Sequence, residues 1–153
     1  MKNLNSDFHT VYLGLGSNLG NSQETILMAY KEIEKLIGTI VRQSAFYISE
    51  PWGFESAHLF TNTVICVSTQ LSPHEVLRQT QTIERSLGKN SSHATERTVT
   101  ANQQPLIHYH DRPIDIDILL YDDLHIDTPD LKIPHPLMQE RDFVMKPLRE
   151  ILQ

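Results

Sequence analysis

The chain has 153 residues, a net charge of −6 and 39% hydrophobic residues, which predicts a single globular domain over 1–153. The acidic balance argues against nonspecific nucleic-acid binding, because that function needs a basic surface. The sequence contains no apolar run long enough for a membrane span, and its N-terminus does not resemble a signal peptide. The single cysteine, Cys66, lies in an apolar run and fits a reducing, cytoplasmic compartment.

The N-terminal part predicts a strand followed by a helix. "VYLGL" at 11–15 is a short apolar strand, and "GSNLGN" at 16–21 has the composition of a turn. Apolar residues at helical spacing predict a helix over 22–37. We expect Asn21 to cap this helix and Gly38 to end it.

Two further strands are predicted next. "IVRQSAFYI" at 40–48 predicts the second strand and "LFTNTVICVS" at 59–68 the third, with a loop containing Pro and Gly at 49–58. Because side chains alternate between the faces of a strand, Phe60 and Asn62 should share one face of the third strand.

A second helix is predicted over 73–87. Ser72 and Glu75 form a capping-box pattern at its start, and Gly88 should end it. The polar segment 89–113 then predicts a long irregular loop, which at this length is usually functional. Its three histidines match no zinc-binding spacing, so we expect no zinc site there. The buried stripe of the helix should consist of Val76, Thr80, Ile83 and Leu87.

The C-terminal part completes a recognisable order of elements. "IDIDILLY" at 114–121 predicts the fourth strand, turn residues at 122–123 favour a hairpin within 122–131, and a short helix is expected over 142–150. The order strand, helix, two strands, helix, strand is that of a ferredoxin-like α+β sandwich with an antiparallel sheet. Helices should cover one face of the sheet, and loops or a ligand the other.

Two carboxylates lie within the predicted fourth strand. Asp115 and Asp117 should project from one face, roughly 6.6 Å apart along the strand, while the neighbouring isoleucines face the helices. Carboxylates this close repel each other, and Mg²⁺, which takes one or two carboxylates together with phosphate oxygens, would relieve that repulsion. A solvated face of an open sheet is the alternative, and the spacing alone leaves both readings open.

A guanidinium precedes these carboxylates. Arg112 is placed to neutralise charge on a transferring phosphoryl group, and a salt bridge to Asp111 or Asp115 is its alternative role. Lys132 and Arg141 add further cations, so an anionic substrate is compatible with the negative net charge.

Six segments occur in the order found in one enzyme family. They are "YLGLGSNLGN", "SAFYISEPWGF", "FTNTVICVST", "TQTIERSLG", "RPIDIDILLY" and "IPHPLMQERDFVMKPL", spanning residues 12 to about 150. The chain therefore resembles the 6-hydroxymethyl-7,8-dihydropterin pyrophosphokinases of folate biosynthesis. The resemblance implies transfer of pyrophosphate from ATP to the hydroxymethyl oxygen of the pterin, giving AMP and the pterin diphosphate. It also implies two Mg²⁺ ions held by Asp115 and Asp117, with Arg112 beside them.

The resemblance also implies a pterin site. Asn62 matches an amide that hydrogen-bonds the ring, and Phe60 and Phe143 match aromatic positions that sandwich it. Glu50 stands where a proline is often found, so its side-chain role is open. Further pterin contacts are implied for Ser49, Glu50, Trp52 and Tyr109.

An ATP site is implied as well. Ile118 matches a position whose backbone addresses the adenine, and His135 and Arg141 match positions that contact the phosphates or the ribose. Further ATP contacts are implied for Gln81, Glu84, Lys89 and Lys132. Without the resemblance, Gln81, Glu84 and Lys132 read as ordinary surface polar groups.

The segment before Asp115 departs from the family pattern. "YHDR" at 109–112 stands where "WGPR" is usual, so Tyr109 would replace a tryptophan lid beside atypical neighbours. The preceding loop is longer than usual and contains one arginine, Arg97, which we assign as a phosphate clamp. Its closure would exclude water, which would otherwise hydrolyse ATP.

Two other classes of protein stay open at this point. One is a non-catalytic ferredoxin-like binding module, and the other is a D-x-D nucleotide-sugar transferase, for which 153 residues is short. An assay for AMP formed from ATP and the pterin distinguishes the pyrophosphokinase from both of these classes. We expect a monomer without nucleic-acid or membrane partners, with an oligomer left open.

Overall fold

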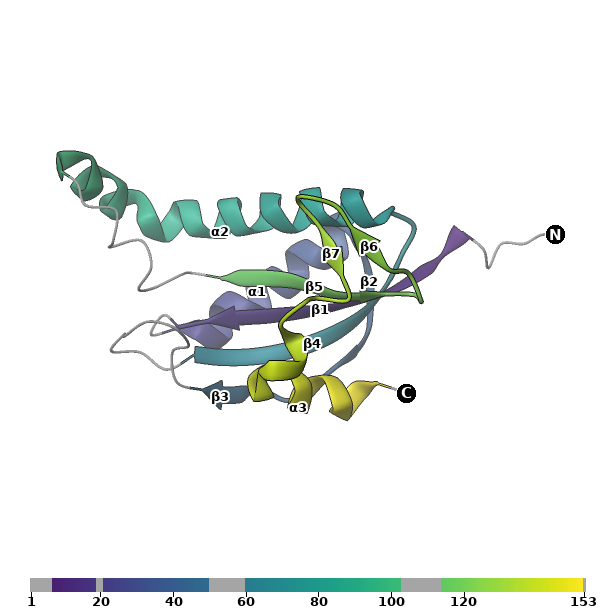
Figure 1. Ribbon diagram of the computed structural model, residues 1–153. Coiled ribbons are helices and arrows are strands. Elements are labelled where there is room, and N and C mark those ends of the chain that lie inside the picture. Colours follow the sequence, from purple (N-terminus) through teal and green to yellow (C-terminus); the bar gives the residue numbers. More distant parts are fainter. Residues whose placement is uncertain (1–6, 19–20, 50–59, 103–113, 153) are drawn as a thin grey trace.

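The computed structural model describes residues 7–18, 21–49, 60–102 and 114–152, and for 89–102 it describes the helical backbone alone. Antiparallel strands form a five-stranded sheet in the order β2–β4–β1–β5 (Figure 1). The fifth strand, β3, pairs with the start of β4, whereas β2 pairs with its end. This order confirms the predicted ferredoxin-like α+β fold. The strands are β1 (His9–Ser17), β2 (Gly38–Gln43), β3 (Tyr47–Ser49), β4 (Phe60–Thr69) and β5 (Asp115–Tyr121). The other elements are α1 (Ser22–Leu36), α2 (Pro73–Asn102), β6 (Ile126–Asp127), β7 (Lys132–Ile133), the 3₁₀ turn η3 (Met138–Glu140) and α3 (Asp142–Ile151).

The main core lies between the sheet and the first two helices. Ile26 of α1 and Ile83 of α2 are fully buried against Leu13, Ile65 and other apolar side chains of the sheet. The isoleucines of β5 belong to this core, as their alternation with the aspartates predicts. All four residues of the predicted stripe on α2 are buried, namely Val76, Thr80, Ile83 and Leu87.

The opposite face of the sheet carries a second, smaller core. Val64 and Cys66 of β4 pack there against Leu148 and Ile151 of α3 (Figure 1). The prediction that only loops or a ligand would cover this face is therefore wrong for the part beneath α3. The strong amphipathicity of α3 is the physical reason, because its apolar side must be buried against another element.

Three local predictions in the N-terminal half are wrong. The strand β1 continues through Gly16 and Ser17, because both residues pair with β4 where the sequence indicated a turn. The side chain of Asn21 occupies the N-cap position without making a capping hydrogen bond. The predicted strand 40–48 is two strands, since the Ser44 hydroxyl accepts the Val64 N–H at 3.0 Å in place of a backbone carbonyl.

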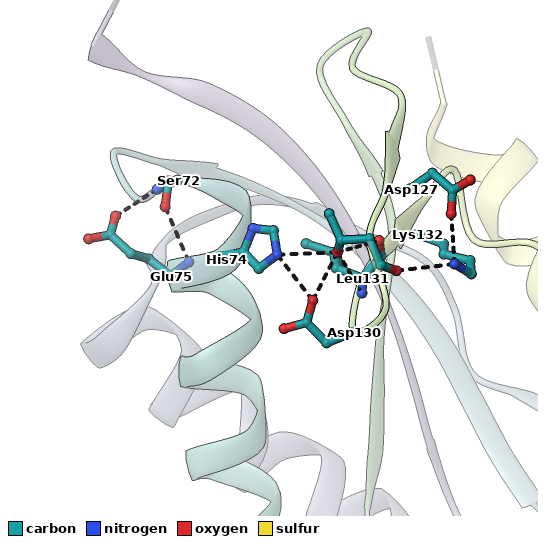
Figure 2. A network of polar contacts seen from close by, with 8 residues as sticks. Ser72, His74, Glu75, Asp127, Asp130, Leu131 and Lys132 are labelled. Carbon is teal, nitrogen blue, oxygen red and sulfur yellow. Dashed lines mark hydrogen bonds and ion pairs between the residues drawn. The ribbon is translucent and has the colours of Figure 1, made fainter.

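The second helix begins as predicted and ends much later. Ser72 N–H donates to Glu75 Oε1 at 2.8 Å and Glu75 N–H donates to Ser72 Oγ at 3.2 Å, so the capping box is confirmed (Figure 2). These bonds lower the pKa of Glu75. The helix then runs through Gly88 to Asn102, which corrects the predicted loop over 89–102. A helical glycine costs only about 1 kcal/mol, and no proline follows before Pro105.

The C-terminal part contains the predicted helix and a displaced hairpin. The turn at Asp122 ends β5, with Asp122 at φ 49° and its carboxylate accepting the Thr10 N–H at 2.8 Å. The hairpin itself consists of β6 and β7, which pair with each other, and it turns at 128–131. None of the helices in the described part of the chain is long and apolar enough to cross a membrane.

Candidate active site

A cavity of about 340 Å³ opens on the sheet face that carries α3, beside that helix. We call it the first cavity. It brings together eight residues that the sequence assigned to substrate or metal binding, contributed by three strands, the C-terminal segment and the start of α3. They are Ser49, Phe60, Asn62, Asp115, Asp117, His135, Arg141 and Phe143.

The two aspartates share the floor of the first cavity with two glycines. In the strand register, Asp115 lies opposite Gly16 and Asp117 opposite Gly14. The glycines have no side chain, so no side chain from β1 stands directly opposite the half-buried carboxylates. A Cβ atom at Gly16 would lie 3.1 Å from Asn62 Oδ1. Neither glycine was predicted as a site residue, although glycine at alternate positions of a strand signals close approach of another group.

The donor set suits a hard divalent cation that shares its coordination with a ligand. Among the described residues, no group of three or more His, Cys, Asp or Glu side chains is arranged to hold a metal. Asp115 and Asp117 supply carboxylate oxygens on one face, and the remaining coordination positions would fall to water and phosphate oxygens. Mg²⁺ prefers this arrangement, whereas a structural zinc site would need four protein ligands.

The amide of Asn62 is held in one orientation. Its Nδ2 donates to Ser49 Oγ at 2.8 Å and to the Tyr47 carbonyl at 3.2 Å. Within the described structure, the side-chain amide makes its hydrogen bonds by donating from Nδ2. Oδ1 is therefore the atom that can accept a hydrogen bond from a ligand. Ser49 therefore orients the residue expected to read the pterin ring.

The aromatic wall of the first cavity depends on the position of α3. Phe143 lies in the first turn of this helix, and the Arg141 guanidinium lies 5.7 Å from the centre of its ring. At the other end, Arg42 Nε donates to the Ile151 carbonyl at 2.9 Å. Glu150 accepts the Tyr47 hydroxyl at 2.8 Å, which raises the pKa of Tyr47. No sequence pattern indicated these long-range contacts.

His135 lies between the first cavity and a second one. Burial lowers its pKa, the positive charge of Arg141 lowers it further, and Asp115 acts in the opposite direction. The ring is therefore neutral at neutral pH. Its Nδ1 accepts the Leu137 N–H at 3.2 Å, which places the ring proton on Nε2 and makes that atom a hydrogen-bond donor.

The second cavity, of about 300 Å³, lies between α2, the outer edge of β5 and the β6–β7 hairpin. It contains Ile118, Lys132 and His135, three residues assigned to ATP, and it shares Asp117 and His135 with the first cavity. The two cavities therefore adjoin at these side chains. The other residues that line this cavity were not predicted as site residues, namely Leu77, Ile116, Pro129, Asp130, Leu131 and Pro136.

Two of the other residues assigned to ATP are located on the described part of α2. Glu84 Oε2 accepts the Ile116 N–H at 2.7 Å, so this carboxylate binds the edge of β5 to the helix. Gln81 is exposed on the same helix. Lys89 and Arg97 lie on the helical backbone of α2 and not in a loop, and their side chains are outside the described part. Glu50, Trp52, Tyr109 and Arg112 also lie outside the described residues.

Comparisons with known proteins point to one family, the family that the sequence segments resemble. The family model described as 7,8-dihydro-6-hydroxymethylpterin-pyrophosphokinase (HPPK) matches residues 12–153. The chain is 44% identical to the 2-amino-4-hydroxy-6-hydroxymethyldihydropteridine pyrophosphokinase of Porphyromonas gingivalis, over 92% of this chain and 89% of that protein. It is 41% identical to the protein of the same name from Aquifex aeolicus, over 93% and 79% of the two chains.

Solved structures show the same fold. A Plasmodium falciparum HPPK-DHPS triple mutant, crystallised with STZ-DHP, superimposes with a TM-score of 0.66 at 16% identity. The match covers 95% of this chain and 40% of that one, so the chain spans less than half of the solved protein.

The structure is that of an α+β protein whose antiparallel sheet carries two adjoining cavities. The chain belongs to the 7,8-dihydro-6-hydroxymethylpterin-pyrophosphokinase family. The predicted family and enzyme class are thereby confirmed. So is the predicted reaction, the transfer of pyrophosphate from ATP to the hydroxymethyl group of the dihydropterin in folate biosynthesis.

Proposed function

We propose that the first cavity binds the pterin, the second binds the adenosine of ATP, and pyrophosphate transfer occurs at their junction. The observation that carries this proposal is the position of Asp117 and His135, which line both cavities. A group held at the junction can contact the phosphates of a nucleotide in one cavity and the hydroxymethyl group of a pterin in the other. Positioning of this kind supplies much of the rate in phosphoryl transfer.

Asp115 and Asp117 would hold the two Mg²⁺ ions that the resemblance implies. Metal ions held there would supply positive charge against the phosphates. Arg141 lines the first cavity and offers a guanidinium for the phosphates. Arg112, three positions before Asp115 in the sequence, is assigned the same function. Asp117 also accepts or orients the proton of the attacking hydroxyl. Arg97 is assigned as a phosphate clamp from α2, and Lys89 as a further nucleotide contact.

The pterin would be held by polar and aromatic groups together. Asn62 Oδ1 accepts from the donor edge of the heterocycle, while Phe60 and Phe143 cover its faces. Glu50, Trp52 and Tyr109 are assigned to complete this site. In the second cavity, Ile118 lies on β5 at the outer edge of the sheet, where its backbone N–H and C=O groups can hydrogen-bond the adenine. Lys132, His135, Gln81 and Glu84 are assigned to the remainder of the nucleotide.

A product assay tests the proposal. The protein is incubated with ATP, Mg²⁺ and 6-hydroxymethyl-7,8-dihydropterin, and the nucleotide products are separated. We expect AMP and the pterin diphosphate, with no product when the pterin or Mg²⁺ is omitted. ADP as the product, or binding without turnover, would contradict the proposal.

We further propose that the chain acts as a monomeric, single-domain cytoplasmic enzyme without nucleic-acid or membrane partners. Sedimentation of the purified protein tests whether it is a monomer.

The substitution Asn62→Ala should weaken pterin binding. It removes the amide that would bind the ring and leaves the half-buried Ser49 hydroxyl and Tyr47 carbonyl without this partner, so the KM for the pterin should rise about tenfold or more, while the KM for ATP changes little. The control is Asn21→Ala, an exposed residue that lines neither cavity and whose side chain makes no capping hydrogen bond. Equal changes in both KM values would contradict the assignment.

A further inference from the structure

We infer that His74 is a positioning residue for the second cavity, because it joins the first turn of α2 to the tip of the β6–β7 hairpin, residues 128–131. This inference rests on the proposed function, in which the second cavity binds the adenosine of ATP. The contact involves His74, Thr128 and Asp130, and we call it the tip clamp (Figure 2).

The hairpin needs support from outside itself. Each of its strands contains two residues, and an isolated two-stranded hairpin is marginally stable in water. Its apolar side is anchored, since Leu131 of the turn and Ile133 of β7 are buried in the main core. The His135 N–H that follows the hairpin also donates to the Leu119 carbonyl of β5 at 3.0 Å.

The tip is held by the clamp. His74 Nε2 lies 3.3 Å from Asp130 Oδ1 and 3.4 Å from Thr128 Oγ1, and Thr128 Oγ1 donates to Asp130 Oδ1 at 2.8 Å (Figure 2). The hydrogen bond from Thr128, together with a smaller contribution from His74, lowers the pKa of Asp130, so the carboxylate is ionised at neutral pH. Within the described part of the chain, His74 is the residue outside the hairpin that makes polar side-chain contact with this tip.

The clamp connects two opposite walls of the second cavity. Leu77, one helical turn after His74, lines the cavity from α2. Pro129, Asp130 and Leu131 line it from the hairpin tip. The contact between His74 and Asp130 therefore acts, together with the buried Leu131, on the separation of these walls.

The same hairpin carries a residue assigned to ATP. Lys132 Nζ donates to Asp127 Oδ1 at 2.7 Å and to the Thr128 carbonyl at 3.1 Å (Figure 2). Because these partners belong to the hairpin, the ammonium group moves with it. A hairpin released at its tip would displace both Lys132 and the cavity wall, and it would leave the pterin site in place.

The test is His74→Ala, with AMP formation measured while ATP and the pterin are varied separately. We expect the KM for ATP to rise about three- to fivefold, the size expected from losing one exposed charged contact, with the KM for the pterin and kcat unchanged. Asp130→Ala should give the same rise, and the double variant no more than either single one. His74→Gln, whose amide can still donate to Asp130, should recover most of the affinity. His125→Ala, an exposed histidine between β5 and the hairpin, is the matched control and should behave as the unaltered protein.

The outcomes separate this inference from the proposed function. If the unaltered protein forms AMP but His74→Ala leaves the KM for ATP unchanged, the clamp has no positioning role and the proposed function stands. Parallel rises in both KM values, or additive effects in the double variant, would also overturn the clamp. Failure of the unaltered protein to form AMP would overturn both.

Discussion

Replacing Asp117 by Asn should reduce AMP formation by at least about a hundredfold while the protein stays folded. The substitution keeps the size of the side chain and removes the charge that would hold the cations at the junction of the two cavities. Electrostatic groups directed at a transferring phosphoryl group typically have effects of this size. The loss should appear in kcat at saturating ATP, pterin and Mg²⁺.

The stability of this variant provides an internal check. Asp117 is half-buried and asparagine keeps the size of the side chain, so we expect a melting temperature close to that of the unaltered protein. Asp123→Asn, in the exposed turn after β5, is the matched control and should retain activity. Near-normal turnover in Asp117→Asn would remove the metal-binding role from this residue.

Replacing Gly38 by Ala should cause a large loss of stability. A Cβ atom at Gly38 would overlap the Ser68 carbonyl oxygen and would lie 3.0 Å from Thr69 Cα. Both contacts are with the backbone of β4, so β2 must move away from its partner strand. We expect the free energy of unfolding to fall by about 3 kcal/mol, measured by urea denaturation.

A second glycine of the same sheet serves as the control for Gly38. A Cβ atom at Gly14 would meet the flexible side chain of Leu119 at 3.4 Å, which is ordinary van der Waals contact. Gly14→Ala should therefore change stability by less than about 1 kcal/mol, since the clash is absent and alanine lowers the entropy of the unfolded chain. Equal losses in the two variants would show that the close approach of β2 and β4 does not determine the result.

The fold could be predicted because its signals are local. The capping box at Ser72 and Glu75 and the alternation in "IDIDILLY" each depend on residues a few positions apart, and the structure confirms both. The errors arose where a local signal competed with a longer-range one. Gly88 resembles a helix end, but a single glycine costs too little to stop α2. Gly38 does follow the end of α1 as predicted, and its close contact with β4 is a second reason for glycine there that the local pattern does not show.

The sequence by itself determined which residues can do chemistry: the paired aspartates, the amide, the aromatic rings and the family to which they belong. The tertiary structure decided how they are combined. The register of β1 with β5 places glycines opposite both aspartates, and the amphipathic α3 brings Phe143 to the same cavity from far along the chain. The hairpin that forms the second cavity depends on His74, which lies 56 positions before Asp130. Contacts of this separation depend on how the elements pack together, and no short stretch of sequence encodes them.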